Sequence, residues 1–327
     1  LLSLAALVHV QLGELPRYCV KLYDVATQTL VEAWAKARRA VAGAGGGAVR
    51  AVDYATEGRA VLPALALHMH ERCPGGVIAE RELLSFVAGR LRGAAAPDPL
   101  PDEQRAKDFL ERLSAAGSLL VERGAEQWGF MHQTFQEYLA AKHLAAQDRH
   151  NELLDQRLYA ARWEEVIQFT AGELGVVQGR AREAGKFIAS ILGDARDWRA
   201  TDLRRNVLLA ARCAADTVYE HAGVEAALLA ALREILASGG PPWSAVEKTL
   251  RYLRSTPLAS LLVDGSEAWP KRDEALVALG RRDLVIPRLL RTLRVDESEW
   301  ARREAAHALG DLGAREAIDD LQRTLRV

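Results

Sequence analysis

Two segments near the C-terminal end of the chain repeat each other, and this repeat restricts the fold more than any other sequence feature. Residues 274–280 (EALVALG) recur as residues 304–310 (EAAHALG), at an offset of 30. Residues 291–295 (RTLRV) recur unchanged as residues 323–327, at an offset of 32. Each unit has the pattern of two helices, and a lone helix pair cannot bury its apolar face. The units must therefore stack into a solenoid.

The repeated units resemble HEAT repeats, and the clearest copies are residues 272–295 and 302–327. The resemblance implies an α-solenoid of helix pairs over residues 151–327, with further repeats following in the parent protein. Beyond Asn151 the sequence has no strand signal. Apolar periodicity there predicts helices at 163–174, 181–192, 202–219 and 225–237.

Two details of the repeat predict how the units pack. The second helix of each unit places three apolar residues at i, i+3 and i+7, namely Ile286, Leu289 and Leu293, then Ile318, Leu321 and Leu325. The two offsets differ by two residues. We assign this extra pair, Leu312 and Gly313, to the turn between the helices of the last unit.

The chain before residue 150 combines helices with one hairpin. Apolar runs at 119–121 and 128–130 flank a short turn that contains Gly124, which is typical of a β-hairpin. Periodicity predicts helices at 1–12, 20–41, 53–69, 80–91 and 102–116, and Gly13 closes the first. We therefore predict a mainly α chain: a helical bundle over 1–47, a winged-helix domain over 48–150 and the solenoid. The first boundary is the glycine-rich break at 43–47.

The segment that follows the hairpin is the densest local signal in the chain. Thr134 and Glu137 have the spacing of a capping box, which predicts a helix start at Thr134. Phe135, Tyr138 and Leu139 then fall on one helical face. Lys142 interrupts that face and is expected to extend its ammonium group to solvent.

Residues 130–145 (FMHQTFQEYLAAKHLA) resemble the end of the winged-helix domain that follows the NACHT module in STAND-class NTPases, the NOD-like receptors and their bacterial relatives. Residues 1–34 resemble the last helical part of a NACHT module, through Leu1-Leu2, Leu15-Pro16 and Leu22-Tyr23. The resemblance implies that the chain is the C-terminal part of a bacterial NACHT-type NTPase. In that parent, ATP or ADP would bind with Mg²⁺, and the P-loop part would lie upstream.

His132 is the one candidate site residue. In the resembled family, the matching histidine contacts the phosphates of ADP and maintains the closed, inactive state. An imidazole N–H is a suitable donor to a phosphate oxygen. The alternative is that His132 only satisfies the corner between strand and helix. Glu137 is interpreted as a capping residue.

No catalytic residue is expected in this chain. The glycine-rich stretch at 43–47 is followed by Ala48, Val49 and Arg50, whereas a P-loop requires lysine and Ser or Thr. We therefore predict that the chain alone is not an enzyme and holds no cofactor. Three dispersed cysteines (Cys19, Cys73 and Cys213) fit a cytoplasmic location, and the sequence contains no membrane-length apolar run.

Other clusters have weaker signals. His68, His70 and Cys73 have ligand chemistry, but two residues apart on a helix they diverge, so no metal site is predicted. The following aspartates show no pairing that suggests acid–base chemistry: Asp194, Asp197, Asp202, Asp216, Asp319 and Asp320. Positive charge gathers near the repeat at Arg281, Arg282, Arg288, Arg291, Arg294, Arg302, Arg303 and Arg315. We interpret this as a solvated rim, with an acidic-partner surface as the alternative.

These observations favour the regulatory and sensor part of an ATP/ADP-switched signalling protein. The winged helix would close on nucleotide, the repeats would recognise a protein or other ligand, and activation would produce a self-oligomer. Bacterial defence is the physiological role that this class of protein suggests. The first alternative is a nucleotide-independent HEAT scaffold, with the short repeats of bilin lyases as a variant. The second is a DNA-binding regulator, which the net charge of −1 and the nearly neutral helix 102–116 disfavour.

Overall fold

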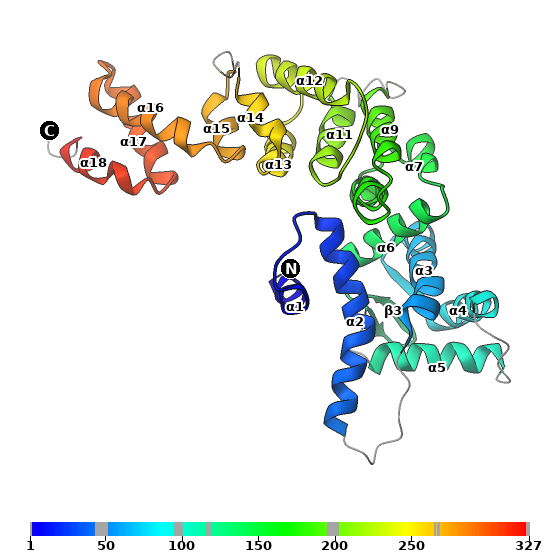
Figure 1. Ribbon diagram of the computed structural model, residues 1–327. Helices are drawn as coiled ribbons and strands as arrows, with labels where there is room; N and C mark the ends of the chain where they lie inside the picture. The colour runs from blue at the N-terminus through cyan, green and yellow to red at the C-terminus, as the bar shows by residue number, and fades with distance from the viewer. Residues whose placement is uncertain are drawn as a thin grey trace.

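The structure is a computed structural model of the 327-residue chain, and it describes residues 2–42, 52–94, 101–115, 119–194, 203–264, 266 and 269–324. Helices dominate it and one small sheet is present, so the predicted mainly α class is confirmed. Figure 1 shows a lower body made by the N-terminal part of the chain and an arch of helices that extends to the C-terminal end. The glycine-rich break at 43–47 and Leu325 lie outside the described residues.

The first two helices are α1 (Leu2–Leu12) and α2 (Cys19–Ala42). Gly13 ends α1, as predicted. Its φ is +77°, a conformation that favours glycine, and its amide donates to the His9 carbonyl oxygen at 2.8 Å. α2 buries Ala26, Thr29 and Leu30 on its inner face.

The next region has the elements of a winged helix. Its helical elements are η2 (Tyr54–Gly58, a π turn), α3 (Arg59–Arg72), α4 (Glu80–Ala94), α5 (Asp102–Ala115) and α6 (Gln133–Ala146). Its strands are β1 (Val77–Ala79), β2 (Leu120–Gly124) and β3 (Gln127–Phe130), in the order β1-β3-β2 with both pairings antiparallel. The predicted hairpin is confirmed as β2–β3. β1 was not expected, because three residues are too few for an alternating pattern.

The arch consists of helices in succession. They are α7 (Asn151–Gln156), η3 (Ala161–Trp163), α8 (Glu164–Gly172), η4 (Glu173–Val177), α9 (Ala181–Leu192), α11 (Arg205–Ala215), α12 (Val224–Ser238), α13 (Trp243–Leu253), α14 (Pro257–Val263), α15 (Arg272–Ala278), α16 (Arg282–Val295), α17 (Glu299–Asp311), η6 (Arg315–Ala317) and α18 (Ile318–Thr324). α8, α11, α13 and α15 pack against one another in series, and α12 covers the outer side (Figure 1). Within the described ranges, no helix is both long and apolar enough to cross a membrane.

The winged helix and the start of the arch share a core. One cluster of buried apolar residues runs from Val8 to Leu279, and α6 packs directly against α8. A second, smaller cluster lies between the last helix pairs, from Leu276 to Ala317. The domain boundaries at 47 and 150 stay predictions.

The helix predicted to end at Gly175 continues past it. The chain passes from α8 into the π turn η4, which includes Gly175. A Cβ at Gly175 would collide with the carbonyl oxygen of Val218. This glycine therefore permits close approach of another backbone segment instead of ending a helix.

The repeat follows its prediction in part. Leu289 and Leu293 are buried on α16, as predicted, but Val285 is buried at the start of that helix while Ile286 is only half-buried. In the last unit Ala317 is buried, Leu321 is half-buried and Ile318 is 48% exposed. Leu312 and Gly313 lie in the turn between the helices, as predicted, and Gly313, with φ +60°, ends α17 where Gly280, with φ +77°, ends α15. This turn is no longer than the one before it, because α17 continues to Asp311 and takes up the extra length.

Candidate functional site

α6 begins at the strand-to-helix corner that follows β3, and His132 is its N-cap. The backbone of His132 is extended, with φ −143° and ψ 140°, and its Nδ1 accepts a hydrogen bond from the Thr134 amide at 3.2 Å. The predicted capping box is therefore wrong. Because the helix starts at Gln133, Thr134 lies inside the first turn, where its own amide needs an acceptor. Glu137 instead accepts from the Gln133 side-chain amide at 2.8 Å.

The cap contact leaves His132 with one available donor. A neutral imidazole has one acceptor and one donor nitrogen, and Nδ1 is the acceptor here. Nε2 therefore carries the hydrogen. The side chain is exposed, so this N–H and the positive end of α6 are both accessible to a ligand. The predicted corner role is thus present, and it is compatible with an anion contact.

The body of α6 is buried among aromatic side chains. Tyr23 of α2 lies edge-on to Phe135 at 5.3 Å and to Phe169 of α8 at 5.2 Å between ring centroids. Tyr138 packs edge-on to Phe169 at 5.8 Å. Aromatic pairs at these separations are favourable beyond the area that they bury. The two N-terminal turns of α6 are therefore held between α2 and α8.

Lys142 does not extend to solvent, in contrast to the prediction. Its Nζ lies 2.7 Å from Asp24 Oδ1, 2.9 Å from the Tyr138 hydroxyl and 3.5 Å from Glu173 Oε1. Tyr138 also donates to Asp24 at 3.0 Å, and Lys21 binds the other Asp24 oxygen at 2.9 Å. The carboxylates of Asp24 in α2 and Glu173 in η4 compensate the positive charge of Lys142 in place of water, so the ammonium group can be buried. We call Asp24, Tyr138, Lys142 and Glu173 the junction cluster.

The pKa values of the two acids in the junction cluster are shifted in opposite directions. Burial opposes ionisation of Asp24, but Lys142 and Lys21 outweigh it and hold its pKa below the usual value. For Glu173 burial is the largest influence and raises the pKa, although Lys142 lowers it in part. Glu173 Oε2 and the Tyr54 hydroxyl, both buried, have no hydrogen-bond partner among the described residues. The cluster thus joins α2, α6 and η4 through ion pairs, and each buried charge is compensated by its partners.

The histidine and cysteine candidates do not converge. His68 Nε2 lies 2.8 Å from Glu82, while the His70 ring is edge-on to Trp163 at 4.5 Å. His70 is buried, which lowers its pKa to about 4, and Cys73 is half-buried. Among the residues that the structure describes, no group of three or more His, Cys, Asp or Glu side chains could hold a metal ion.

The cations of α5, which would be the recognition helix of a DNA-binding protein, are paired. Arg112 contacts Glu57 at 2.9 Å, Lys107 contacts Glu103 at 2.9 Å and Arg105 contacts Asp102 at 3.7 Å. Phosphate binding requires cations whose charge is uncompensated. The pairing therefore adds to the sequence argument against DNA.

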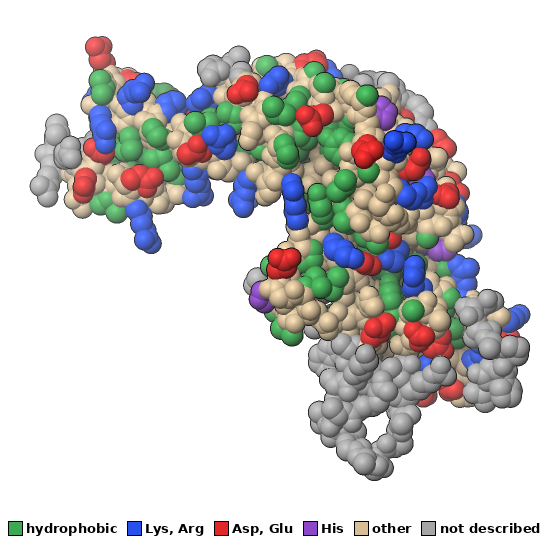
Figure 2. All heavy atoms as spheres, viewed as in Figure 1, with side chains coloured by type: hydrophobic (Ala, Val, Ile, Leu, Met, Phe, Trp, Pro, Cys, Tyr) green, Lys and Arg blue, Asp and Glu red, His purple; other side chains and the backbone are tan. Residues whose placement is uncertain are grey.

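The arginines near the repeat are also largely engaged. Arg281 pairs with Asp283 at 2.9 Å, Arg294 with Asp320 at 2.6 Å, and Arg288 with Asp273. Arg302 donates to the Asp296 carbonyl oxygen at 2.6 Å. Figure 2 shows basic and acidic side chains interspersed over this part of the arch. These contacts support the interpretation of a solvated rim.

The aspartates singled out in the sequence are dispersed. Asp194 accepts from the Tyr159 hydroxyl at 2.8 Å, and Asp216 accepts from the Cys19 amide at 2.7 Å. Asp320 pairs with Arg294, and Asp319 lies on the exposed side of α18. Asp197 and Asp202 lie outside the described residues. The described aspartates therefore act in separate structural contacts.

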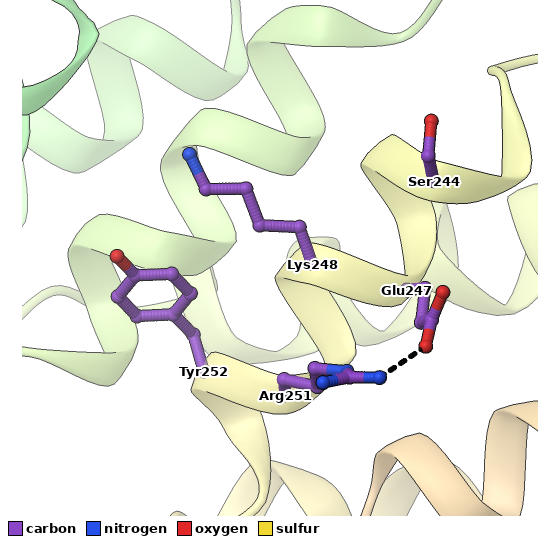
Figure 3. Close-up of a pocket in the computed structure, with 5 residues that line it drawn as sticks. All are labelled: Ser244, Glu247, Lys248, Arg251 and Tyr252. Carbon is purple, nitrogen blue, oxygen red and sulfur yellow. Dashed lines mark hydrogen bonds and ion pairs between the residues drawn. The ribbon is translucent and has the colours of Figure 1, made fainter.

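An open pocket of about 490 Å³ lies along α13, and Ser244, Glu247, Lys248, Arg251 and Tyr252 line it. Figure 3 shows Lys248 and Tyr252 extending toward neighbouring helices and Arg251 turned toward Glu247, which it contacts at 2.6 Å. Lys248 lies 3.5 Å from Glu165. Both cations have carboxylate partners, so this pocket has no excess charge to attract an anion.

The acids that matter at the junction were not identified from the sequence. Asp24 and Glu173 are ordinary helix residues in their local context, and their partners lie far away along the chain. The only local signal was Lys142 on an otherwise apolar face.

Comparison with known families agrees with this arrangement. Residues 19–144 match the winged helix-turn-helix domain C-terminal to NACHT, and residues 255–327 match HEAT repeats. The first match begins at Cys19 and so includes α2. No curated protein and no solved structure matched the chain. The chain therefore combines a winged-helix domain of the NACHT-associated family with HEAT repeats.

Proposed function

We propose that this chain is the regulatory and sensor part of a STAND-class signalling protein that switches between ADP and ATP. The winged helix closes on nucleotide held with Mg²⁺ by a NACHT module, and the HEAT repeats recognise a protein or other ligand. Ligand binding then favours an open, self-associating state, because it has higher affinity for that state. The protein acts in the cytoplasm, and bacterial defence is the physiological role that we propose.

The position of His132 carries this proposal. Its Nε2–H is exposed at the positive end of α6, and donors of this kind bind phosphate oxygens. The same helix carries Lys142 ten residues later, about 15 Å along its axis. A nucleotide contact at His132 would therefore bias the position of a helix that is bound to both α2 and η4.

The test compares two substitutions in the intact protein. His132→Ala removes both the helix cap and the imidazole donor, whereas His132→Asn keeps a good cap and removes only the imidazole. We expect both variants to retain about tenfold less ADP than the natural protein, because a hydrogen bond to a charged group contributes about 1.5–3 kcal/mol. Bound ADP is measured by chromatography of nucleotide released from the purified protein.

Met131→Ala is the control, since Met131 is a neighbouring exposed residue that makes no cap contact through its side chain. It should retain ADP normally. Normal retention by His132→Asn together with loss by His132→Ala would assign the effect to capping alone. Normal retention by both variants would contradict the nucleotide contact.

The second candidate is a HEAT scaffold that works without nucleotide. The match of residues 255–327 to HEAT repeats supports it, because such repeats mediate protein interactions. The two candidates differ in one observable. A scaffold would bind its partner equally well in the presence of ADP and ATP, whereas the switch that we propose would bind with different affinities.

A further inference from the structure

The N-terminus of α2 has no local capping side chain. The helix starts at Cys19, and the preceding residue is Tyr18, whose carbonyl oxygen accepts from the Lys21 and Leu22 amides at 3.1 and 3.3 Å. A tyrosine ring cannot cap the first free amides as Ser, Thr, Asp or Asn would. These amides need an acceptor from elsewhere.

Asp216, at the end of α11 in the arch, supplies that acceptor. The Cys19 amide donates to Asp216 Oδ1 at 2.7 Å, across 197 positions of sequence. The Val20 amide also favours the charged form of Asp216 and lowers its pKa. The carboxylate thus acts as an N-cap that belongs to a different region of the chain, and it lies at the positive end of the α2 dipole.

Asp216 has little else to stabilise its charge. The side chain is 8% exposed, and Oδ2 has no hydrogen-bond partner in the segments that the structure describes. Within the described part of the chain, no lysine or arginine forms an ion pair with it, and the nearby Glu165 carries like charge. Burying a carboxylate without a cation costs free energy, so desolvation of Asp216 weakens the contact with α2.

The surrounding contacts place α2 directly on the arch. A Cβ at Gly172 would lie 2.9 Å from Val20, so only glycine allows this approach. Thr217, next to Asp216, donates its hydroxyl to the Ala171 carbonyl oxygen at 2.8 Å. Arg17 reaches the Ser255 carbonyl oxygen at 3.5 Å, a long contact on the exposed side. Asp216 is therefore the strongest polar link at this end of α2.

We propose that Asp216 is a releasable latch that caps α2 from a distant part of the same chain and holds the start of α2 against the arch. Loss of the cap frees the first turn of α2 and changes the distance between the arch and α1, which packs on α2. This inference does not rest on nucleotide binding, so it can be tested in the present chain without ligand.

The experiment measures the distance between α1 and α14 by pulsed electron spin resonance. Spin labels are attached at Val10→Cys and Ser260→Cys, both exposed positions, after replacement of Cys19, Cys73 and Cys213 by alanine. Asp216→Ala is expected to broaden and lengthen the distance distribution. Hydrogen exchange of the amides at positions 19 and 20 should accelerate roughly tenfold or more, as expected for the loss of a cap.

Three further variants make the test specific. Asp216→Asn keeps an acceptor oxygen and should retain the natural distribution. Glu165→Gln removes the neighbouring charge without touching the cap and should also leave it unchanged. Cys19→Pro removes the amide donor from the other side of the contact. Proline is well accepted at the first helical position, so this variant tests the latch even if Asp216→Ala does not fold. It should broaden the distribution.

An unchanged distribution in both Asp216→Ala and the proline variant would overturn the latch. Equal broadening by Glu165→Gln would overturn it as well, because charge and not capping would then control α1. Neither result bears on the His132 proposal, whose readout is bound ADP.

Discussion

The junction between the winged helix and the arch differs from the terminal HEAT units in the distance over which its contacts are made. Lys142 meets Asp24 across 118 positions, and Cys19 meets Asp216 across 197. In the last units, Arg294 meets Asp320 across only 26 positions, within adjacent helix pairs. The repeats are thus stabilised by neighbours in sequence, while the junction requires the complete fold. We expect the junction to respond strongly to single substitutions.

The two regions also differ in whether their ion pairs are buried or exposed. Lys142 and Glu173 are buried together, whereas Arg281 and Asp283 form their pair in solvent. A buried ion pair that loses one partner leaves an unpaired charge in a poorly solvated place. An exposed pair contributes at most about 1 kcal/mol. Substitutions at the junction cluster should therefore give the largest effects in the chain.

The largest effect is expected for Lys142→Met. Methionine preserves the length of the side chain but leaves Glu173 and one oxygen of Asp24 without their cation. The free energy of unfolding of the region that contains α6 should fall by about 3–5 kcal/mol. Urea unfolding followed by tyrosine and tryptophan fluorescence measures this loss. The matched control is Lys248→Met, which removes an exposed ion pair with Glu165 and should cost about 1 kcal/mol or less. Equal losses would show that the junction cluster is not special.

The second effect concerns pH and two buried groups with opposite shifts. Burial raises the pKa of Asp216 from 3.8 to about 6, so its contribution to stability is present below pH 3.8 and lost as the pH rises through 6. Burial lowers the pKa of His70 from 6.5 to about 4, so its contribution is present above pH 6.5 and lost as the pH falls through 4. Between pH 4 and 6 the two slopes oppose each other.

Replacing one of the two groups should reveal how the other makes the free energy of unfolding depend on pH. Asp216→Asn should make stability rise with pH by about 3 kcal/mol more than in the natural chain, since each pKa unit corresponds to about 1.4 kcal/mol. His70→Asn should make it fall with pH by a similar amount. Urea unfolding at a series of pH values between 4 and 6.5 measures both slopes. Parallel profiles for all three proteins would contradict the assignment.

The same comparison explains how far the sequence could be interpreted. The helix pairs and the β2–β3 hairpin follow from local periodicity and turn residues, so they could be predicted. His132 was found because a resemblance singled out its segment. Its capping role was assigned to Thr134, since the N-cap was placed two residues late. Asp24, Glu173 and Asp216 have no local signal, because a buried charge is recognisable only through its partner.

The smallest effects come from a pair of glycines, and their signs should differ. Gly175 in η4 faces the carbonyl oxygen of Val218, so Gly175→Ala must displace a backbone segment and should cost about 1–3 kcal/mol. Gly310 lies inside α17 with no atom near the position of a Cβ. There alanine only restricts the unfolded chain and favours the helix, so Gly310→Ala should stabilise by about 0.5–1 kcal/mol. Thermal unfolding of the two variants measures the contrast.

Both glycines would look like helix ends in a single sequence, and only the fold distinguishes them. At the junction the absence of a Cβ lets a distant backbone segment approach Gly175, whereas no atom approaches the position of a Cβ at Gly310 in the repeat. Destabilisation by both substitutions would show that the terminal units pack against more of the chain than their own neighbours.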